Sequence, residues 1–302
     1  MQNASVKFRI ESVADVTRIA AAGSKQGAWY RGHGDADWPL LPHVHRDEFP
    51  EPIQEHLLAQ TFRSHASPLM PNAPKVDEPL EWLYIMQHHG LPTRLLDWTC
   101  SPLIAAFFVV WNSDRDGIDG CLWQLLPATM NDIINGSTAR LGKGDPTLNQ
   151  IVSNAFAMPA KRNAAKTPHL AMNSSHIDQR QMLQQSEFTI HDTRDPLHEH
   201  ERVREFAIKY VVPKSAKLNL RTELRALGVN RHSMFPDLAN IALSITDDVR
   251  NPVRATVGAY IEDKKREWAA VDVLKALAQK VREEADKAAS EASAAENIEK
   301  AD

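Results

Sequence analysis

The stretch LYIMQHHGLPTRLLDWTCSPLIAAFFVVW, from Leu83 to Trp111, constrains the fold of this chain more than any other segment. Apolar residues dominate it, yet histidines, an arginine, an aspartate and threonines interrupt it within a short span. Burying a polar group without a partner is costly, so each of these side chains needs one. The stretch therefore predicts a helix that ends at Gly90, an extended polar segment over 91–99, and a buried helix capped by Ser101.

Helical and strand-like patterns recur along the rest of the chain. Apolar residues at helical spacing predict helices within residues 11–23, 51–66, 215–229 and 235–250. Runs rich in β-branched and aromatic residues predict strands within residues 28–31, 120–127, 188–192 and 205–213. Residues 131–175 are polar with no clear period, which predicts an irregular insertion.

Composition limits the class of protein. The chain has 302 residues, 43% of them hydrophobic, and a formal net charge of -4, so no overall basic field draws it to nucleic acid. Cys100 and Cys121 are the only cysteines, which argues against a disulfide framework. The first residues lack an apolar signal segment, and the longest apolar run, LIAAFFVVW, is too short to span a bilayer. We expect a soluble, cytoplasmic protein that makes no membrane contact.

The last part of the chain differs from the rest in amino-acid composition. After Gly258 it lacks glycine and proline and is rich in alanine, glutamate and lysine, which favours a long helix. Its apolar residues form a partial stripe: Tyr260, Trp268, Val271, Leu274, Leu277 and Val281. Such a stripe packs on the helix's own domain or binds a partner. We predict one domain over 1–250 and a charged helical extension over 251–302.

The first motif with chemical potential is WYRGHGD, from Trp29 to Asp35. Arg31 at the end of a strand offers a rigid fork of donors that suits phosphate oxygens. Gly32 and Gly34 leave room for a ligand to approach the backbone. The alternative is an arginine in an ion pair at a tight turn.

The second motif is the polar segment of the opening stretch. Thr93, Asp97 and Thr99 gather there around Arg94 and Trp98. Asp97 can pair with Arg94 or with Arg31, and a neighbouring guanidinium keeps a buried carboxylate ionised. The hydroxyl groups can bind a ligand or cap the next helix.

The third motif is IDQRQMLQQSEFTIHD, from Ile177 to Asp192, in which Gln184, Gln185 and Glu187 approach a strand. A glutamate there can offset positive charge or bind sugar hydroxyls, whereas spacing alone favours an ordinary polar connector. The 13 histidines include two His-x-His pairs, but none has the partner set of a metal site, so we predict no metal. The phosphate-loop and dinucleotide-binding motifs do not occur in the sequence.

Taken in order, these segments resemble the FRG domain family. WYRGHGDADWPLLPHVHR, QHHGLPTRLLDWTCSPLIAAFFVVW, RQMLQQSEFT, EFAIKYVVP and LRALGVNRHSMFPDLANIA carry the resemblance. The aromatic-Arg-Gly motif of the family is here Tyr30-Arg31-Gly32, with tyrosine in place of phenylalanine. Ser186 stands where the family pattern has glycine. The resemblance covers residues 10–245.

The same order of motifs is similar, more distantly, to ADP-ribosyltransferase folds. This likeness implies an α+β fold with a mixed sheet core and flanking helices, to which composition adds a long C-terminal helix outside the resemblance. It also implies NAD as a substrate, with Arg31 on a phosphate and Gly32 beside it. Thr93 or Thr99 would hold the nicotinamide ribose, and Trp98 or Tyr30 would stack on a ring. Cleavage of NAD builds up positive charge on the ribose. The ADP-ribosyltransferase likeness implies that Glu187 faces this charge, whereas the FRG pattern implies Gln184.

Two functions follow from this resemblance. The first is an NAD-dependent ADP-ribosyltransferase acting on a protein or nucleic acid, as an intracellular toxin or phage-defence effector. The second is a non-enzymatic nucleotide- or nucleic-acid-binding module, in which Arg31, Arg94 and Arg180 form an anion pocket and Asp97 is structural. In either case the C-terminal helix is a candidate docking segment for an antitoxin or chaperone partner.

Overall fold

The computed structural model describes residues 8–163, 168–174, 179–250, 264–265, 268–269, 271–280 and 282. The chain divides into two compact units, Met1–Asn240 and Ile241–Asp302, and each is described by itself. The predicted domain boundary between residues 250 and 251 stays a prediction.

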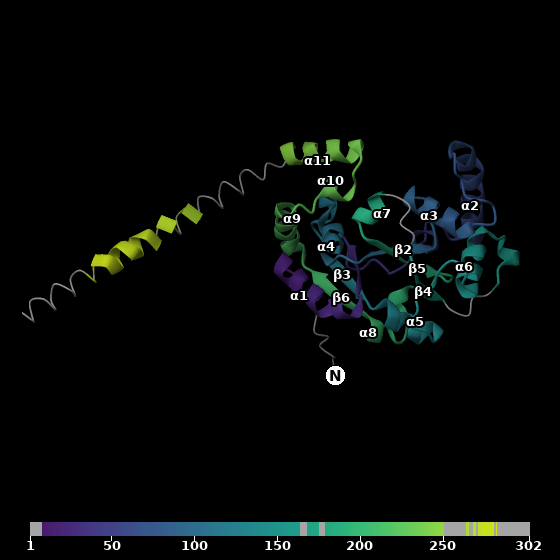
Figure 1. Cartoon of the computed structure of the whole chain (residues 1–302), viewed down its shortest axis with the longest axis horizontal. Helices are drawn as coiled ribbons and strands as arrows, with labels where there is room; N and C mark the ends of the chain where they lie inside the picture. The colour runs from purple at the N-terminus through teal and green to yellow at the C-terminus, as the bar shows by residue number, and fades with distance from the viewer. Residues whose placement is uncertain are drawn as a thin grey trace, which may run out of the picture. The chain divides into compact units, whose positions relative to one another are not determined.

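The first unit is built on a six-stranded sheet with the order β4-β5-β2-β1-β3-β6 (Figure 1). The strands are β1 (Trp29–His33), β2 (Leu95–Thr99), β3 (Gly120–Leu125), β4 (His169–Met172), β5 (Ser186–His191) and β6 (Ala207–Val212). All five strand pairings are antiparallel, and the parallel contacts of the described residues are isolated bridges outside the named strands. The α+β class is therefore confirmed, whereas the expectation of a mixed sheet was wrong.

A seam divides this sheet between β1 and β2. These strands pair at a single position, Tyr30 with Thr99, while β1 pairs with β3 at five positions and β2 pairs with β5 at five. Two half-sheets, β4-β5-β2 and β1-β3-β6, thus meet at one point. Polar backbone groups that lack a ladder partner along such a seam need other partners.

Helices of the first unit flank the sheet. They are α1 (Val13–Gly23), α2 (Pro52–Ala66), α3 (Pro79–His88), α4 (Pro102–Val110), α5 (Pro127–Asn135), α6 (Pro146–Phe156), α7 (Gln179–Leu183), α8 (Val203–Phe206), α9 (Lys217–Ala226) and α10 (Arg231–Met234). Helix α11 (Leu238–Arg250) begins in the first unit and continues into the second. Short 3-10 turns lie at Ser24–Gln26, His43–His45, Ser67–Leu69, Ser113–Arg115, Pro159–Lys161, Leu197–Glu199 and Lys214–Ala216. Helices α1, α4 and α9 pack together beside β1 and β3, and α2, α3 and α6 form a second group (Figure 1).

Helix α4 lies directly against β1 because of a glycine. A Cβ atom on Gly32 would come within 1.9 Å of the carbonyl oxygen of Ala105, so only glycine allows this approach. The helix begins as predicted, since the Ser101 hydroxyl accepts from the Ile104 amide and Pro102 occupies the first turn. Gly32 thus makes room for helix α4, and it also lines a pocket at the seam between β1 and β2.

The segment expected to be irregular, 131–175, contains helix α6 and strand β4. Asp145 caps α6 by accepting from the amides of Thr147 and Leu148, and Pro146 follows it. The helix buries one apolar face against α2 and α3. The expectation was wrong, because the buried apolar residues of α6 recur at helical spacing within this otherwise polar stretch.

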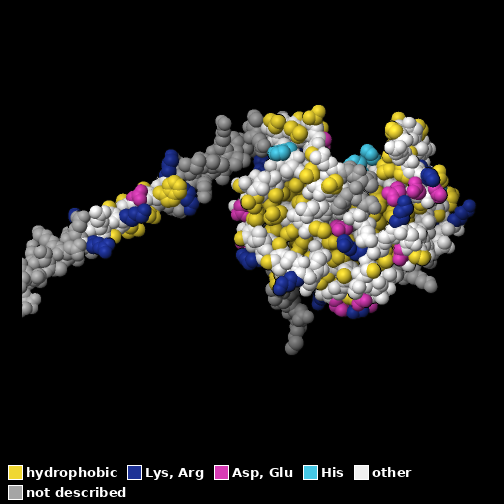
Figure 2. All heavy atoms as spheres, in the orientation of Figure 1, with side chains coloured by type: hydrophobic (Ala, Val, Ile, Leu, Met, Phe, Trp, Pro, Cys, Tyr) yellow, Lys and Arg dark blue, Asp and Glu magenta, His cyan; other side chains and the backbone are white. Residues whose placement is uncertain are grey.

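In the second unit the structure describes residues 241–250 and parts of 264–282. Residues 271–280 are helical, as expected, and Figure 2 shows apolar side chains beside lysines and arginines there. Trp268, Val271, Leu274 and Leu277 are all exposed. The described residues 264–265, 268–269 and 282 are helical too, and the other parts of the predicted C-terminal helix lie outside the described residues. Within them, none of the helices has the length and apolar character that crossing a membrane requires.

Candidate functional site

A pocket of about 350 Å³ opens at the seam between β1 and β2. We call it the arginine pocket. Its charged and amide lining residues are Arg31, Arg46, Arg180, Asp97, Gln87 and Gln184. Its aromatic and apolar wall includes Tyr30, Trp98, Leu91, Ala105 and Phe108. Segments far apart in the sequence therefore converge on one concave site, the usual form of a small-molecule site.

Arg31 closes the seam beyond the single strand pair. Its Nη1 donates to the Asp97 carbonyl oxygen at 2.6 Å, and its Nε donates to His33 Nε2 at 2.9 Å. The Asp97 carboxylate lies farther away, 3.9 Å from Nη1. Burial lowers the pKa of Arg31 to about 10, against the opposing effect of Asp97, so the side chain is cationic near pH 7.

Two further arginines make the pocket electropositive. Arg46 follows the 3-10 turn at residues 43–45, and its Nε donates to the Leu41 carbonyl at 3.3 Å. Burial lowers its pKa. Arg180, on α7, packs its guanidinium 4.7 Å from the centre of the Phe235 ring. Against these three cations, the described lining residues set one carboxylate, that of Asp97.

Gln184 is held at the pocket by contacts at both ends. Its side-chain Nε2 donates to the Met234 carbonyl at 3.0 Å. Its backbone carbonyl oxygen accepts from the Thr99 hydroxyl at 2.7 Å, so the hydrogen of that hydroxyl is already used. The next residue, Gln185, has a φ of 47°, a conformation that costs energy for a residue with a side chain. The turn that presents Gln184 is thus fixed by β2 and by a strained backbone.

Trp98 and Tyr30 contribute to the wall, although both are almost fully buried. The indole Nε1 of Trp98 donates to the Thr189 hydroxyl at 3.0 Å, which fixes the ring. Both residues keep nearly all of their surface in the core, so little of either is exposed to the pocket. Broad stacking on a ligand would require these rings to move.

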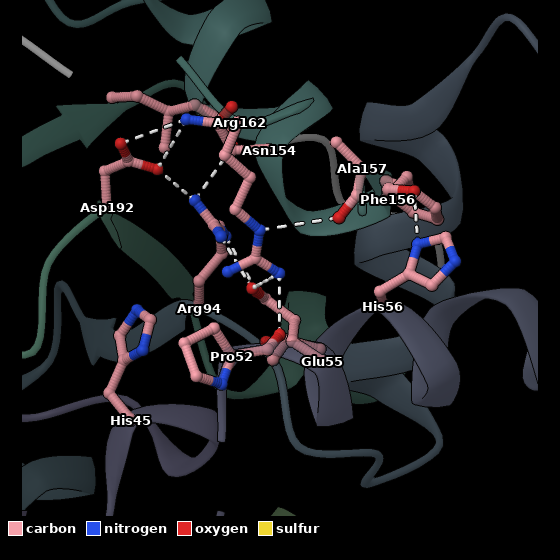
Figure 3. A network of polar contacts seen from close by, with 12 residues as sticks. His45, Pro52, Glu55, His56, Arg94, Asn154, Phe156, Ala157, Arg162 and Asp192 are labelled. Atoms are coloured by element: carbon pink, nitrogen blue, oxygen red, sulfur yellow. Dashed lines mark hydrogen bonds and ion pairs between the residues drawn. The ribbon is translucent and has the colours of Figure 1, made fainter. Parts of the chain in front are cut away.

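Arg94 does not line the pocket; it is fully buried in an ion network (Figure 3). It forms a two-bond pair with Glu55 at 2.8 and 2.6 Å, and it also pairs with Asp192. Burial alone lowers the pKa of Arg94, but these two carboxylates raise it above its ordinary value. Arg162 joins the network through Glu55 at 3.0 Å. This geometry gives Arg94 a structural role in place of the predicted ligand contact.

Thr93 is also buried and lies behind the pocket. Its hydroxyl accepts from the Leu95 amide at 3.1 Å and donates to the Gln87 side chain. The predicted contact of Thr93 with a ribose is therefore replaced by a contact with a residue of the pocket wall.

Glu187 lies in a different pocket, of about 610 Å³, which shares only Tyr30 with the arginine pocket. Its carboxylate pairs with Arg140 at 3.1 Å and accepts from the Ser174 hydroxyl at 2.8 Å. The Cys100 Sγ lies 3.7 Å from Glu187 Oε1. Burial, and next the charge of Glu187, raise the pKa of the Cys100 thiol to about 11. Of the two candidates for the inward position, Gln184 lines the arginine pocket and Glu187 does not.

The sequence interpretation missed His43 and Arg46 in the lining. They stand in a segment that carries the FRG resemblance, WYRGHGDADWPLLPHVHR, but no individual role was predicted for these two residues, and no periodicity ties them to the opening stretch. A backbone bond from Val44 to the Thr93 carbonyl brings the two segments together. In the described part of the chain, no three histidine, cysteine or acidic side chains are grouped as metal ligands.

Comparison with known proteins gives one result for this chain. The family model of the FRG domain matches residues 26–117, the part from the turn before β1 to the end of the loop that follows α4. No curated protein and no solved structure matches the chain. The matched part contains Arg31, Arg46, Gln87 and Asp97, and thus much of the arginine pocket.

Proposed function

We propose that this chain, whose residues 26–117 form an FRG domain, transfers ADP-ribose from NAD to a macromolecular acceptor, a protein or a nucleic acid. The observation that carries the proposal is the convergence of Arg31, Arg46 and Arg180 on one pocket with Gln184 and a carboxylate. Arginine forks suit phosphate oxygens, and amide and carboxylate groups suit ribose hydroxyls. An intracellular toxin or phage-defence effector is the biological setting that we propose for this activity.

The size of the pocket supports a nucleotide-sized ligand. A volume of about 350 Å³ is at the lower end of the range for small-molecule sites. It suits one half of a dinucleotide, with the other half along the open side. The seam in the antiparallel sheet supports, as part of the same proposal, a core like that of ADP-ribosyltransferases.

The reaction assigns a role to each group. The bond between ribose C1′ and the nicotinamide nitrogen breaks, and nicotinamide leaves as a neutral base with the bonding electron pair. The acceptor then attacks C1′ and loses a proton. Arg31, Arg46 and Arg180 would hold the diphosphate, and Gln184 would accept from or donate to a ribose hydroxyl.

Calorimetric binding of NAD and release of nicotinamide test the proposal. The Arg31→Ala variant should bind NAD at least tenfold more weakly, because a charged hydrogen-bonded contact is worth about 1.5–3 kcal/mol. Arg202→Ala is the matched control, since Arg202 is exposed and pairs with Glu205 away from the pocket. If the wild-type protein neither releases nicotinamide nor modifies protein, RNA or DNA, it is no transferase.

The second candidate function is a non-enzymatic nucleotide-binding module. The position of Glu187 outside the arginine pocket favours it, because the glutamate expected to act in catalysis is paired elsewhere. Tight binding of NAD and of ADP-ribose without nicotinamide release would select this function.

A docking role for the C-terminal unit completes the proposal. The exposed apolar side chains of Trp268, Val271, Leu274 and Leu277 support a segment that an antitoxin or chaperone partner covers. A pulldown in which protein truncated after residue 262 retains the same partners would exclude it.

A further inference from the structure

We infer that Asp97 is the carboxylate that faces the positive centre of the ligand, and that Gln87 is the residue that positions it. This inference rests on the proposed function and moves the charge-facing role from Glu187 to a residue of β2. It is carried by the hydrogen-bond pattern around Asp97.

Asp97 is exposed where its neighbours are not. Its side chain is 53% accessible, whereas Leu96 and Trp98 on either side are buried. Among the described residues that line the arginine pocket, it supplies the one carboxylate. Because Asp97 lines the pocket and its side chain stays open between two core residues, its carboxylate is accessible to a ligand.

The two carboxylate oxygens of Asp97 differ. Oδ2 accepts from Gln87 Nε2 at 2.8 Å, while Oδ1 has no partner among the described residues. Arg31 does not neutralise the group closely, since its Nη1 lies 3.9 Å from Oδ2 and donates instead to the backbone carbonyl of Asp97. One oxygen is thus held and the other is available to a ligand.

The amide of Gln87 has only one consistent orientation. A carboxylate oxygen can only accept, so the Gln87 Nε2 group must face Asp97. Gln87 Oε1 then faces Thr93 and accepts from its hydroxyl, which itself accepts from the Leu95 amide. This chain from the backbone of β2 through Thr93 and Gln87 orients the carboxylate before any ligand binds, which is the preorganisation that electrostatic stabilisation requires.

The ligand therefore meets three cations and one oriented anion. Phosphates match the arginines, and a centre that carries or develops positive charge matches Asp97. The nicotinamide ring of NAD carries a positive charge before bond cleavage, and the ribose carries it in the transition state.

Comparison of NAD with NADH isolates this role, because the two differ in the charge of the nicotinamide ring and NADH is not cleaved. Calorimetric titrations in the cold, with the ligand recovered intact, should show wild-type protein binding NAD about tenfold more tightly than NADH. Asp97→Asn should remove this preference while NADH affinity stays within about twofold of wild type. Gln87→Leu should reduce the preference in part.

Glu187→Gln is the control and should keep the full preference. A general loosening of the pocket would weaken both ligands equally, so the ratio reports the carboxylate itself. The inference would be overturned if Asp97→Asn kept the preference, if Glu187→Gln lost it, or if the wild-type protein bound NAD and NADH equally. The proposed function would then still be tested separately by the release of nicotinamide. Wild-type protein that binds neither ligand would overturn both.

Discussion

Arg31 and Arg94 stand at the two motifs that mark this sequence, and their surroundings are opposite. Arg94 is fully buried and has two carboxylates, Glu55 and Asp192, within bonding distance. Arg31 retains 18% of its side-chain surface and has its nearest carboxylate at 3.9 Å. The guanidinium of Arg94 is fully paired within the protein, while the guanidinium of Arg31 can still bind a ligand. A conspicuous arginine in a motif is thus structural or functional according to its counter-charges.

The largest effect expected from this contrast is on folding. Arg94→Ala leaves Glu55 and Asp192 buried without their main partner, so the free energy of unfolding should fall by about 3–5 kcal/mol. Urea unfolding measures the change. The triple variant Arg94→Met, Glu55→Gln and Asp192→Asn should be more stable than Arg94→Ala alone, because the uncompensated charges are gone. Equal stability of the two variants would contradict the network as described.

A second change breaks the packing beside Arg31. Gly32→Ala should cost about 3 kcal/mol of unfolding free energy, because the new Cβ meets the Ala105 carbonyl at 1.9 Å. Gly34→Ala is the matched control in the same motif, since its Cβ would meet nothing nearer than 3.7 Å. Thermal or urea unfolding of the two variants tests whether Gly32 is needed for the packing of α4 on β1. Equal losses of unfolding free energy in the two variants would contradict that role.

The pH dependence of stability sharpens the contrast, because a buried histidine cluster lies next to Arg94. His169 Nδ1 lies 3.2 Å from His191 Nδ1, and His191 Nε2 lies 2.9 Å from the Thr189 hydroxyl. Burial, and next the charge of His200, lower the pKa of His169 to about 4, and burial lowers that of His191 well below its usual range.

A lowered histidine pKa means that the unfolded chain binds the proton first. The stabilisation is therefore complete above pH 6.5 and is lost as the pH falls toward 4. Between pH 7 and pH 5, His169 alone should account for about 2 kcal/mol of lost unfolding free energy. The loss over this range should be smaller by that amount in His169→Gln. An unchanged pH profile in the variant would exclude His169 as the cause.

The smallest effect on folding is expected at Arg31. Arg31→Ala removes bonds to His33 and to the Asp97 carbonyl and should cost only about 1 kcal/mol of unfolding free energy. The same change should weaken NAD binding at least tenfold. Urea unfolding and calorimetry on one preparation compare the two. A stability loss as large as that of Arg94→Ala would make Arg31 structural as well.

Much of the fold could be predicted from local patterns. The strands at 28–31, 120–127 and 188–192, and the helix capped by Ser101, appear where periodicity and capping residues placed them. Helix α6 was missed although its apolar residues recur at helical spacing, whereas strand β4, with four residues, is too short to show a period. The sheet was expected to be mixed because the likeness to ADP-ribosyltransferase folds implied it, and local patterns do not show the pairing direction of distant strands.

The candidate site was predicted only in part. Arg31, Asp97, Trp98, Thr99 and Gln184 do converge on one pocket. Arg46 and His43 were missed, because nothing in the spacing of their segment connects it to β2. Thr93 and Glu187 were placed in the site by the likeness to ADP-ribosyltransferase folds, although their own contacts are made elsewhere.

The sequence by itself determined where polar groups interrupt an apolar chain, and thereby which segments carry the arginines, the carboxylate and the caps. Tertiary structure alone decided which charges neutralise one another, because burial and counter-charges come from segments up to about 100 residues away, as in the pair of Arg94 with Asp192. Glu55 and Asp192 fully occupy one guanidinium, while a single strand pair at Tyr30 leaves a seam beside the other. Charge pairing is a property of three-dimensional distance, and the order of residues along a chain does not fix it.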